Sequence, residues 1–160
     1  AAVQGGAFGA GCEVAVACDF RIVSEGAVFC ENWVDMGAMP PLGGLFLLPR
    51  LVGLERASDM TMRATKVGGK RAVEIGLATV CVEPAALRDS ALQFAQDLAA
   101  RSAPAMAAIK QGLRRGLESS LSGEWEHYVN TQAILLAGPD FSANVDRLDQ
   151  RLRGFAPDKG

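Results

Sequence analysis

The chain has 160 residues, of which 49% are hydrophobic and 21% charged, and its formal net charge is -2 at pH 7. These values are ordinary for a globular domain, they exclude a largely disordered chain, and scattered basic residues exclude an extended face for nucleic acid. No apolar stretch reaches the roughly 18 residues that span a bilayer, and the start lacks the charged region of a signal peptide, so we expect a soluble protein.

The first residues alternate between strand and helix patterns. Residues 1–5 are predicted to end an apolar strand, residues 5–11 to form a glycine-rich turn, and residues 12–18 to form an apolar helix. Two short strands are predicted at residues 19–23 and 27–30, because both runs are rich in strand formers and turn formers separate them. We therefore expect the chain to open in the middle of a fold, with a further segment upstream.

The middle of the chain continues this alternation. Residues 31–44 contain too many Gly and Pro residues for a regular element and are predicted to form an irregular loop. Helices are predicted at 45–51, 53–62 and 71–75, followed by a strand at 78–82. Alternating helices and strands indicate the α/β class.

The last part of the chain changes character and carries only helical patterns. Amphipathic helices are predicted at 84–101, 104–117, 122–136 and 141–155. Their apolar stripes need a surface to bury against, which favours contact with a partner subunit. We therefore divide the chain into an α/β core, 1–83, and a helical oligomerisation region, 84–160.

The cysteines give no sign of a metal centre. Cys12, Cys18, Cys30 and Cys81 lie in apolar runs rather than in zinc-binding pairs, and the single His127 is far from them in sequence. Free structural thiols in a reducing compartment are expected, which favours a cytoplasmic location. No metal or separate cofactor is predicted.

Residues 3–19, with the sequence VQGGAFGAGCEVAVACD, carry the most specific signal in the chain. They resemble the glycine-rich turn and catalytic helix of the crotonase, or enoyl-CoA hydratase/isomerase, superfamily. Further stretches are similar to its second active-site loop, to a later helix and to its C-terminal end, at residues 37–53, 71–78 and 149–155.

The resemblance implies a partial crotonase-like spiral of ββα units with a helical C-terminal region, assembled as a homotrimer or a pair of trimers. In the family a stretch of roughly a hundred residues precedes the position of Ala1, within ordinary domain sizes. That stretch normally supplies one of two backbone donors to an oxyanion hole, together with much of the surface that contacts coenzyme A. The expected substrate is an acyl-CoA thioester, with coenzyme A present only as part of that substrate.

The resemblance also assigns roles around the glycine-rich turn. The backbone amide of Ala10 matches the second oxyanion donor, and Gly9 and Gly11 are small enough for the ligand to approach closely. Glu13 matches a general acid and base, because a carboxylate at the start of a helix beside the substrate can transfer protons. On residue chemistry alone, Glu13 could equally be an acid that favours a helix N-terminus.

The second active-site loop departs from the hydratase pattern. Trp33 occupies the position of the second glutamate, and an indole can only donate a hydrogen bond, so we interpret Trp33 as a wall of the acyl pocket. Glu31 and Asp35 flank it and are candidates for a second acid, with solvated loop acids as the alternative. Pro41 and Leu42 are assigned to the substrate pocket, and Pro41 excludes the aspartate that related dehalogenases and dienoyl-CoA isomerases would place there.

The resulting hypothesis is an enoyl-CoA hydratase/isomerase family enzyme, a lyase or isomerase of fatty acid metabolism that forms an enolate. Its firmly placed acid is Glu13, with the Ala10 amide in the oxyanion hole. The alternative is a catalytically silent family member that serves as a structural or CoA-binding subunit. The acyl group cannot be named, because the other wall of its pocket belongs to the expected upstream segment.

Overall fold

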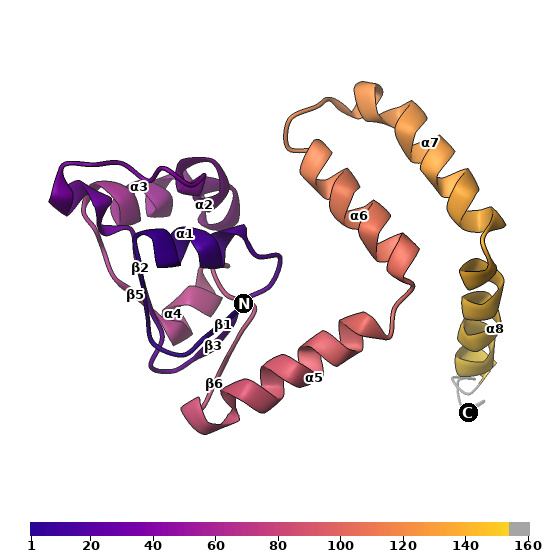
Figure 1. The fold of residues 1–160 in the computed structure, drawn as a ribbon, viewed down its shortest axis with the longest axis horizontal. Coiled ribbons are helices and arrows are strands. Elements are labelled where there is room, and N and C mark those ends of the chain that lie inside the picture. Colours follow the sequence, from indigo (N-terminus) through magenta and orange to yellow (C-terminus); the bar gives the residue numbers. More distant parts are fainter. Residues whose placement is uncertain (154–160) are drawn as a thin grey trace, which may run out of the picture. The chain divides into compact units, whose positions relative to one another are not determined.

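The computed structural model describes residues 1–153 and divides into two compact units (Figure 1). The first unit spans Ala1–Gln96 and mixes strands with helices, whereas the second begins at Asp97 and its described part is helical. The α/β class is therefore confirmed. The predicted division after residue 83 stays a prediction, and residues 154 and 155 of the last predicted helix lie outside the described residues.

The first unit is built from short elements in which two strands precede a helix. Its order is β1 (Ala2–Val3), β2 (Gly6–Phe8), α1 (Ala10–Ala17), β3 (Ile22–Ser24), β4 (Val28–Cys30), the 3-10 helix η1 (Asn32–Met36), α2 (Gly44–Val52), α3 (Leu54–Met62), β5 (Val67–Gly68), α4 (Gly69–Glu74) and β6 (Val80–Val82). The remaining helices are η2 (Pro84–Ala86), α5 (Leu87–Ala99), α6 (Ala103–Arg115), α7 (Leu121–Ala137) and α8 (Pro139–Arg153).

Successive strands alternate between two sheets, which is why the chain advances as a spiral. The order is β1-β3-β6 in one sheet and β2-β4-β5 in the other. In register, Val3 pairs with Val23 and Phe8 pairs with Cys30, both in parallel. The neighbours β3 and β4 do not pair with each other. The turn between them, where the Ala27 amide donates to the Ser24 carbonyl at 3.0 Å, carries the chain from one sheet to the other.

Two short strands were not predicted. The glycine-rich turn contains β2, because backbone pairing of Gly6 with Val28 needs no side chain at that position. The two-residue strand β5 pairs antiparallel with β4, with Val67 opposite Phe29. Runs of this length give no periodic signal, so only the tertiary pairing defines them.

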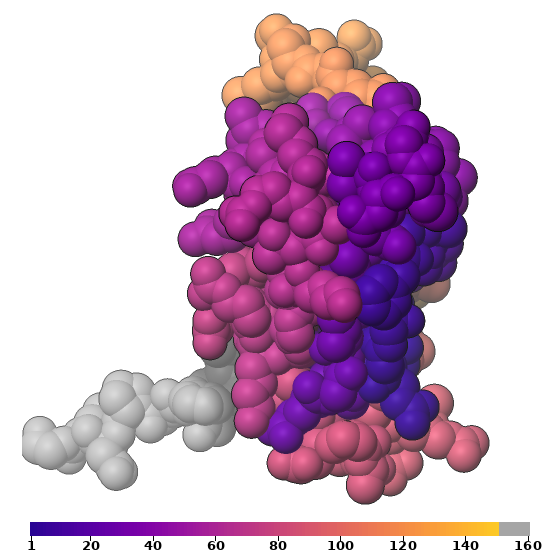
Figure 2. All heavy atoms as spheres, turned by 90° about the vertical axis from the view of Figure 1, so that its left-hand side faces the viewer, coloured from indigo at the N-terminus to yellow at the C-terminus, as the bar shows by residue number. Residues whose placement is uncertain are grey.

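Helix α1 contacts both the strand β2 and the helix α2, and its buried face packs into the core. In Figure 2 the indigo and purple N-terminal segments lie directly against the magenta segments of the first unit. The buried apolar side chains form one cluster that draws on all of these elements. Its largest fully buried members are Phe29, Leu48, Met60 and Leu77.

A buried arginine fixes the end of α1. Arg21 is 4% exposed, and its guanidinium donates to the carbonyls of Ala15, Val16 and Cys18 at the C-terminal end of α1 and to that of Leu77. The cation thus adds a donor to carbonyls at the end of the helix, where few backbone amides remain to pair with them, and complements the negative end of its dipole. Burial lowers the pKa of Arg21.

The start of α4 packs backbone against backbone. A Cβ atom at Gly69 would lie 2.3 Å from the Ser24 carbonyl oxygen, at the end of β3. The hydroxyl of Ser24 donates to the Gln4 carbonyl at 2.6 Å and accepts from the Gly26 amide at 3.2 Å. Glycine at position 69 therefore permits the close approach that joins α4 to this turn.

The second unit has no apolar core among its described residues. Between residues 97 and 150 the only buried residue is Glu124, and large apolar side chains stay exposed along all three of its complete helices. Examples are Leu113, Trp125, Ile134 and Phe141. No helix in the described part of the chain is long and apolar enough to cross a membrane.

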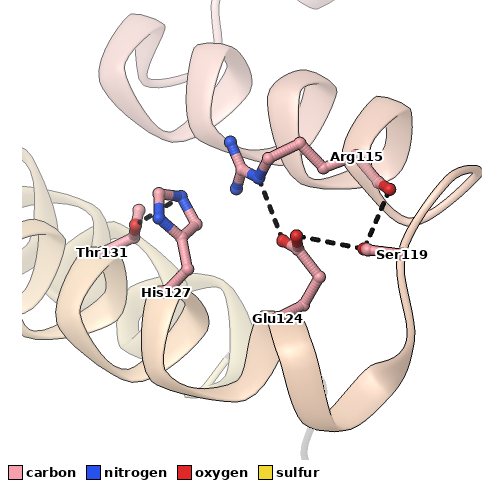
Figure 3. A network of polar contacts seen from close by, with 5 residues as sticks. All are labelled: Arg115, Ser119, Glu124, His127 and Thr131. Carbon is pink, nitrogen blue, oxygen red and sulfur yellow. Dashed lines mark hydrogen bonds and ion pairs between the residues drawn. The ribbon is translucent and has the colours of Figure 1, made fainter.

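A polar network joins α6 to α7 in this unit (Figure 3). Glu124 accepts from the Arg115 guanidinium at 2.9 Å and from the Ser119 hydroxyl at 3.0 Å. The Arg115 hydrogen bond is the main cause of the lowered pKa of Glu124. On the same helix, His127 Nε2 lies 3.2 Å from the Thr131 hydroxyl.

We predict that Arg21→Met lowers the free energy of unfolding by about 3 kcal/mol, because several buried carbonyls lose their donor at about 1 kcal/mol each. Urea unfolding measures the change. The control is Arg56→Met, since Arg56 is exposed and donates only to the carbonyl one turn before it, so its loss should stay within about 0.5 kcal/mol. Equal losses in the two variants would contradict the anchoring role.

We also predict that Gly69→Ala lowers the free energy of unfolding by about 2 kcal/mol, because the new methyl group overlaps a backbone oxygen that cannot move freely. Gly68→Ala is the matched control, because its φ of -74° suits any residue and its Cβ would meet nothing within 4 Å. Thermal or urea unfolding should leave that control at or slightly above the parent stability. A Gly69 variant as stable as the Gly68 variant would refute the packing argument.

Candidate active site

The parallel pairing of β2 with β4 brings two segments to one edge of the sheet. Helix α1 follows β2 directly, and Glu31 follows β4, so the carboxyl ends of both strands deliver them to the same place. The Gly9 amide donates to the Cys30 carbonyl at 2.9 Å and closes this junction. The residues that the sequence singled out around Glu13 and Glu31 therefore meet in space.

The first residues of α1 are exposed, and they directly follow a turn at Gly9. Gly9 has a φ of 49°, a left-handed value that favours glycine, and a Cβ there would lie 3.4 Å from Asn32 Oδ1 and from the Trp33 ring. Ala10 is the first residue of the helix, and Ala10 and Gly11 are exposed. First-turn amides have no acceptor within a helix, so the Ala10 amide can meet a ligand at the positive end of the helix dipole.

Glu13 is held inside the protein by the second loop. Its side chain is 1% exposed, and its Oε2 accepts hydrogen bonds from the amides of Leu42 at 2.7 Å and Gly44 at 2.8 Å. A Cβ at Gly44 would lie 3.0 Å from Glu13 Cγ and Oε2, so glycine allows the loop to approach. The other oxygen, Oε1, is buried and has no hydrogen-bond partner.

Glu31 is also buried in this place. Its side chain is 0% exposed, and neither carboxylate oxygen has a hydrogen-bond partner. Burial, together with the nearby charge of Glu13, raises the pKa of Glu31 to about 7. The side chains of Cys12 and Trp33 lower that pKa as neighbouring donors, but they do not reach full hydrogen-bond geometry and burial outweighs them. Glu31 is therefore a carboxyl group that can be neutral near pH 7.

The other candidate acid is placed differently. Asp35 lies on η1 with its side chain exposed, whereas Trp33, on the same 3-10 helix, is half-buried. The Trp33 indole Nε1 is buried and has no hydrogen-bond partner. The structure thus brings Glu31 and Trp33 together with Glu13, and leaves Asp35 toward solvent.

The second loop contributes its backbone more than its side chains. Pro41 is exposed, and the Leu42 side chain is 57% exposed while its amide binds Glu13. Sequence reasoning missed the amides of Leu42 and Gly44 as partners of Glu13. The available signal was the pair Gly43-Gly44, since Gly43 has a φ of 98° and turns the chain into α2.

The cysteines of the described chain are free thiols, and burial is the main cause of a raised pKa at both Cys12 and Cys30. Raised values keep these thiols protonated and unreactive. Among the described residues, no group of three or more His, Cys, Asp or Glu side chains could hold a metal ion. The charged chemistry of this place therefore rests on its two carboxyl groups.

Known proteins are similar to this chain in sequence and in fold. The short-chain-enoyl-CoA hydratase of Clostridium acetobutylicum is 36% identical over 121 residues, which cover 76% of this chain and 46% of the relative. The 2,3-dehydroadipyl-CoA hydratase of Escherichia coli is 37% identical over 121 residues, covering 76% of this chain and 48% of the relative. The chain thus spans about half the length of the curated relatives that it matches.

Solved structures agree with these relatives. A Cupriavidus metallidurans enoyl-CoA hydratase/isomerase superposes with a TM-score of 0.87 at 29% identity, covering 92% of this chain and 56% of its own. A Thermobifida fusca protein described as an enoyl-CoA hydratase, solved in complex with acetoacetyl-CoA, gives a TM-score of 0.78 at 31% identity, covering 83% and 52%. These neighbours confirm the crotonase-like fold class expected from the sequence.

The family description Enoyl-CoA hydratase/isomerase matches residues 1–137, which is most of the chain. This match agrees with the relatives, with the solved structures and with the spiral of ββα units. The chain therefore belongs to the enoyl-CoA hydratase/isomerase family.

Proposed function

We propose that this chain carries the acid-base part of an enzyme that acts on an acyl-CoA thioester through an enolate. One observation carries the proposal: Glu13 is buried, two amides fix one of its oxygens, and its other oxygen has no protein partner. A carboxylate in this state is oriented and still able to exchange a proton. Relatives named as hydratases of enoyl-CoA esters support the same reaction class.

In this proposal Ala10 acts through its backbone. The thioester oxygen gains negative charge as the enolate forms, and a fixed amide donor stabilises that charge. Ala10 begins α1, so its N–H is free of the helix and lies at the positive end of the dipole. Gly9 and Gly11 leave room for the ligand. A second donor is expected from the upstream segment that family relatives contain.

Glu13 would move the proton during the reaction. With Oε2 held by the amides of Leu42 and Gly44, the unpartnered Oε1 is the oxygen available to exchange a proton with the substrate or with a water molecule. Both hydration and double-bond isomerisation need such an exchange next to an enolate. We place the enzyme in the lyase or isomerase class without choosing between the two.

The apolar loop around the site supports an acyl group as its ligand. Met39, Leu42 and Leu45 expose large apolar side chains near the residues that bind Glu13. Trp33 packs against Gly9 with its ring and supplies a flat apolar wall. We propose Trp33, Pro41 and Leu42 as residues that contact the substrate.

A second candidate is a silent family member that binds CoA esters without turnover. Trp33 favours it, because an indole cannot replace the second glutamate expected at that position. Binding of crotonyl-CoA, 3-enoyl-CoA and aromatic acyl-CoA esters without turnover of any would select this candidate.

We further propose that the protein assembles through its helical unit, as a trimer or a pair of trimers. The support is physical: helices without a core of their own among the described residues expose a large apolar surface, which is stable only when another surface covers it. Adjacent subunits would provide that cover.

We predict that Glu13→Gln in the protein of natural full length lowers kcat by a factor of about 100 to 10,000 while the Kd for the ester changes less than about threefold. The amide keeps the shape of the side chain and removes its basicity. Steady-state assays with the esters above and calorimetric binding measure both quantities. Glu55→Gln, an exposed change on α3, should leave both unchanged, and undiminished turnover in the Glu13 variant would sink the assigned role.

For the assembly, we predict that Ile134→Glu weakens self-association at least about tenfold, because a charge would have to be buried against the partner. Ile134 is 74% exposed in the isolated chain, so its own fold should tolerate the change. Light scattering over a concentration series gives the mass of the assembly. Glu126→Gln on the same helix serves as the control, and a monomeric parent protein would end the proposal.

A further inference from the structure

The buried polar atoms without a partner all gather at one place. Among the described residues they are Oε1 of Glu13, both carboxylate oxygens of Glu31, and Nε1 of Trp33. Glu13 and Glu31 are almost completely buried, and Cys12 and Trp33 lie beside Glu31. Unpartnered groups of this kind are costly, so their concentration in one cluster calls for a shared explanation.

A single proton on Glu31 would give a partner to Glu13 Oε1 and to one oxygen of Glu31. Both carboxyl groups are buried, and the charge of Glu13 acts to raise the pKa of Glu31, whereas a protonated Glu31 could hydrogen-bond to the Glu13 carboxylate. Glu13 already receives two amide donors on its Oε2. Glu31 receives none at full geometry, so the proton belongs on Glu31.

We propose that Glu31 is a positioning residue that holds a proton beside Glu13 and donates it as a hydrogen bond toward one lone pair of Glu13 Oε1, whose second lone pair stays available to exchange a proton with the substrate or with water. This proposal rests on the proposed function of Glu13. It differs from a second acid that touches the substrate, because Glu31 is fully buried and acts through Glu13. Asp35 is excluded from this role by its exposed position on η1.

The surroundings of Glu31 fix the pH range in which it changes state. The titratable groups that act on Glu31 are Cys12 and Glu13, both on α1. The neighbouring thiol of Cys30, on β4, also has the charged groups Lys66 and Asp35 near it. Both cysteine thiols stay protonated and therefore neutral, so neither places a charge beside Glu31. The pKa of Glu31 at about 7 places the loss of its proton just above neutrality.

The raised pKa of Glu31 means that this group stabilises the folded chain more at low pH than at high pH. Because the pKa of Glu31 rises from 4.5 to about 7 on folding, the folded chain binds more protons than the unfolded chain between these values. Its contribution to stability is present below pH 4.5, falls as the pH rises to about 7, and stays lost above that. Substitution by glutamine, which does not titrate, removes this dependence.

The first test does not need turnover. In the protein of natural full length, with ¹³C-labelled glutamate carboxyl groups, NMR should show one carboxyl that titrates near pH 7 and that disappears in Glu31→Gln. In Glu13→Gln the same carboxyl should titrate about one pH unit lower, because the neighbouring negative charge is gone. The proposal would be overturned if every glutamate carboxyl titrated below about pH 5.5. It would also be overturned if the carboxyl that titrates near pH 7 kept the same pKa in the Glu13→Gln variant.

The second test measures kcat/KM against pH. The kcat/KM of the parent should fall at least about fivefold between pH 6 and 8.5. At pH 6 the Glu31→Gln variant should match the parent within about threefold, because the amide still donates a hydrogen bond. Its kcat/KM should not fall between pH 6 and 8.5, because the amide does not titrate. Glu31→Leu, checked for folding by circular dichroism, should lose at least about tenfold at pH 6, and Asp35→Asn should keep the parent profile. A Glu31→Gln variant that retains the fall contradicts the role. A parent protein without turnover defeats the proposed function, while the NMR titration still decides on the shared proton.

Discussion

The two hydrogen bonds from the amides of Leu42 and Gly44 to one oxygen of Glu13 connect the main parts of the first unit. They tie the helix that follows β2 to the loop that opens α2, and they keep a carboxylate buried without a cationic partner. Because the two amides bind Oε2 of Glu13, they also fix the orientation of Oε1. The close approach at Gly44 and the unpartnered Oε1 of Glu13 both belong to that attachment.

The sequence predicted those parts of the fold that have a local signal. Long periodic helices such as α6, the irregular segment between η1 and α2 and the class of the fold could be predicted, because spacing and turn formers encode them. The 3-10 helix η1 inside the predicted loop was not predicted. The strands β2 and β5 could not, because pairing with β4 rather than side-chain pattern defines them. The assignment of β3 and β4 to different sheets also depends on distant partners.

The candidate site divides in the same way. Glu13, Ala10 and the glycines around them were identified from a motif that is contiguous in sequence. The choice between Glu31 and Asp35 could not be made there, because both flank Trp33 at equal spacing and only burial separates them. Backbone donors such as the Leu42 amide carry no residue signature, so only the fold defines the hydrogen-bond partners of Glu13.

The carbonyl groups that bind Arg21 make the scaffold less sensitive to pH and salt than the carboxyl groups of the site it supports. The hydrogen bonds of Arg21 to Ala15, Val16, Cys18 and Leu77 use acceptors that do not titrate, and burial shields them from dissolved ions. A change of pH that alters Glu31 therefore leaves the far end of α1 anchored. The same eight-residue helix carries the buried acid Glu13 near its start and, at its end, an anchor whose acceptors do not titrate.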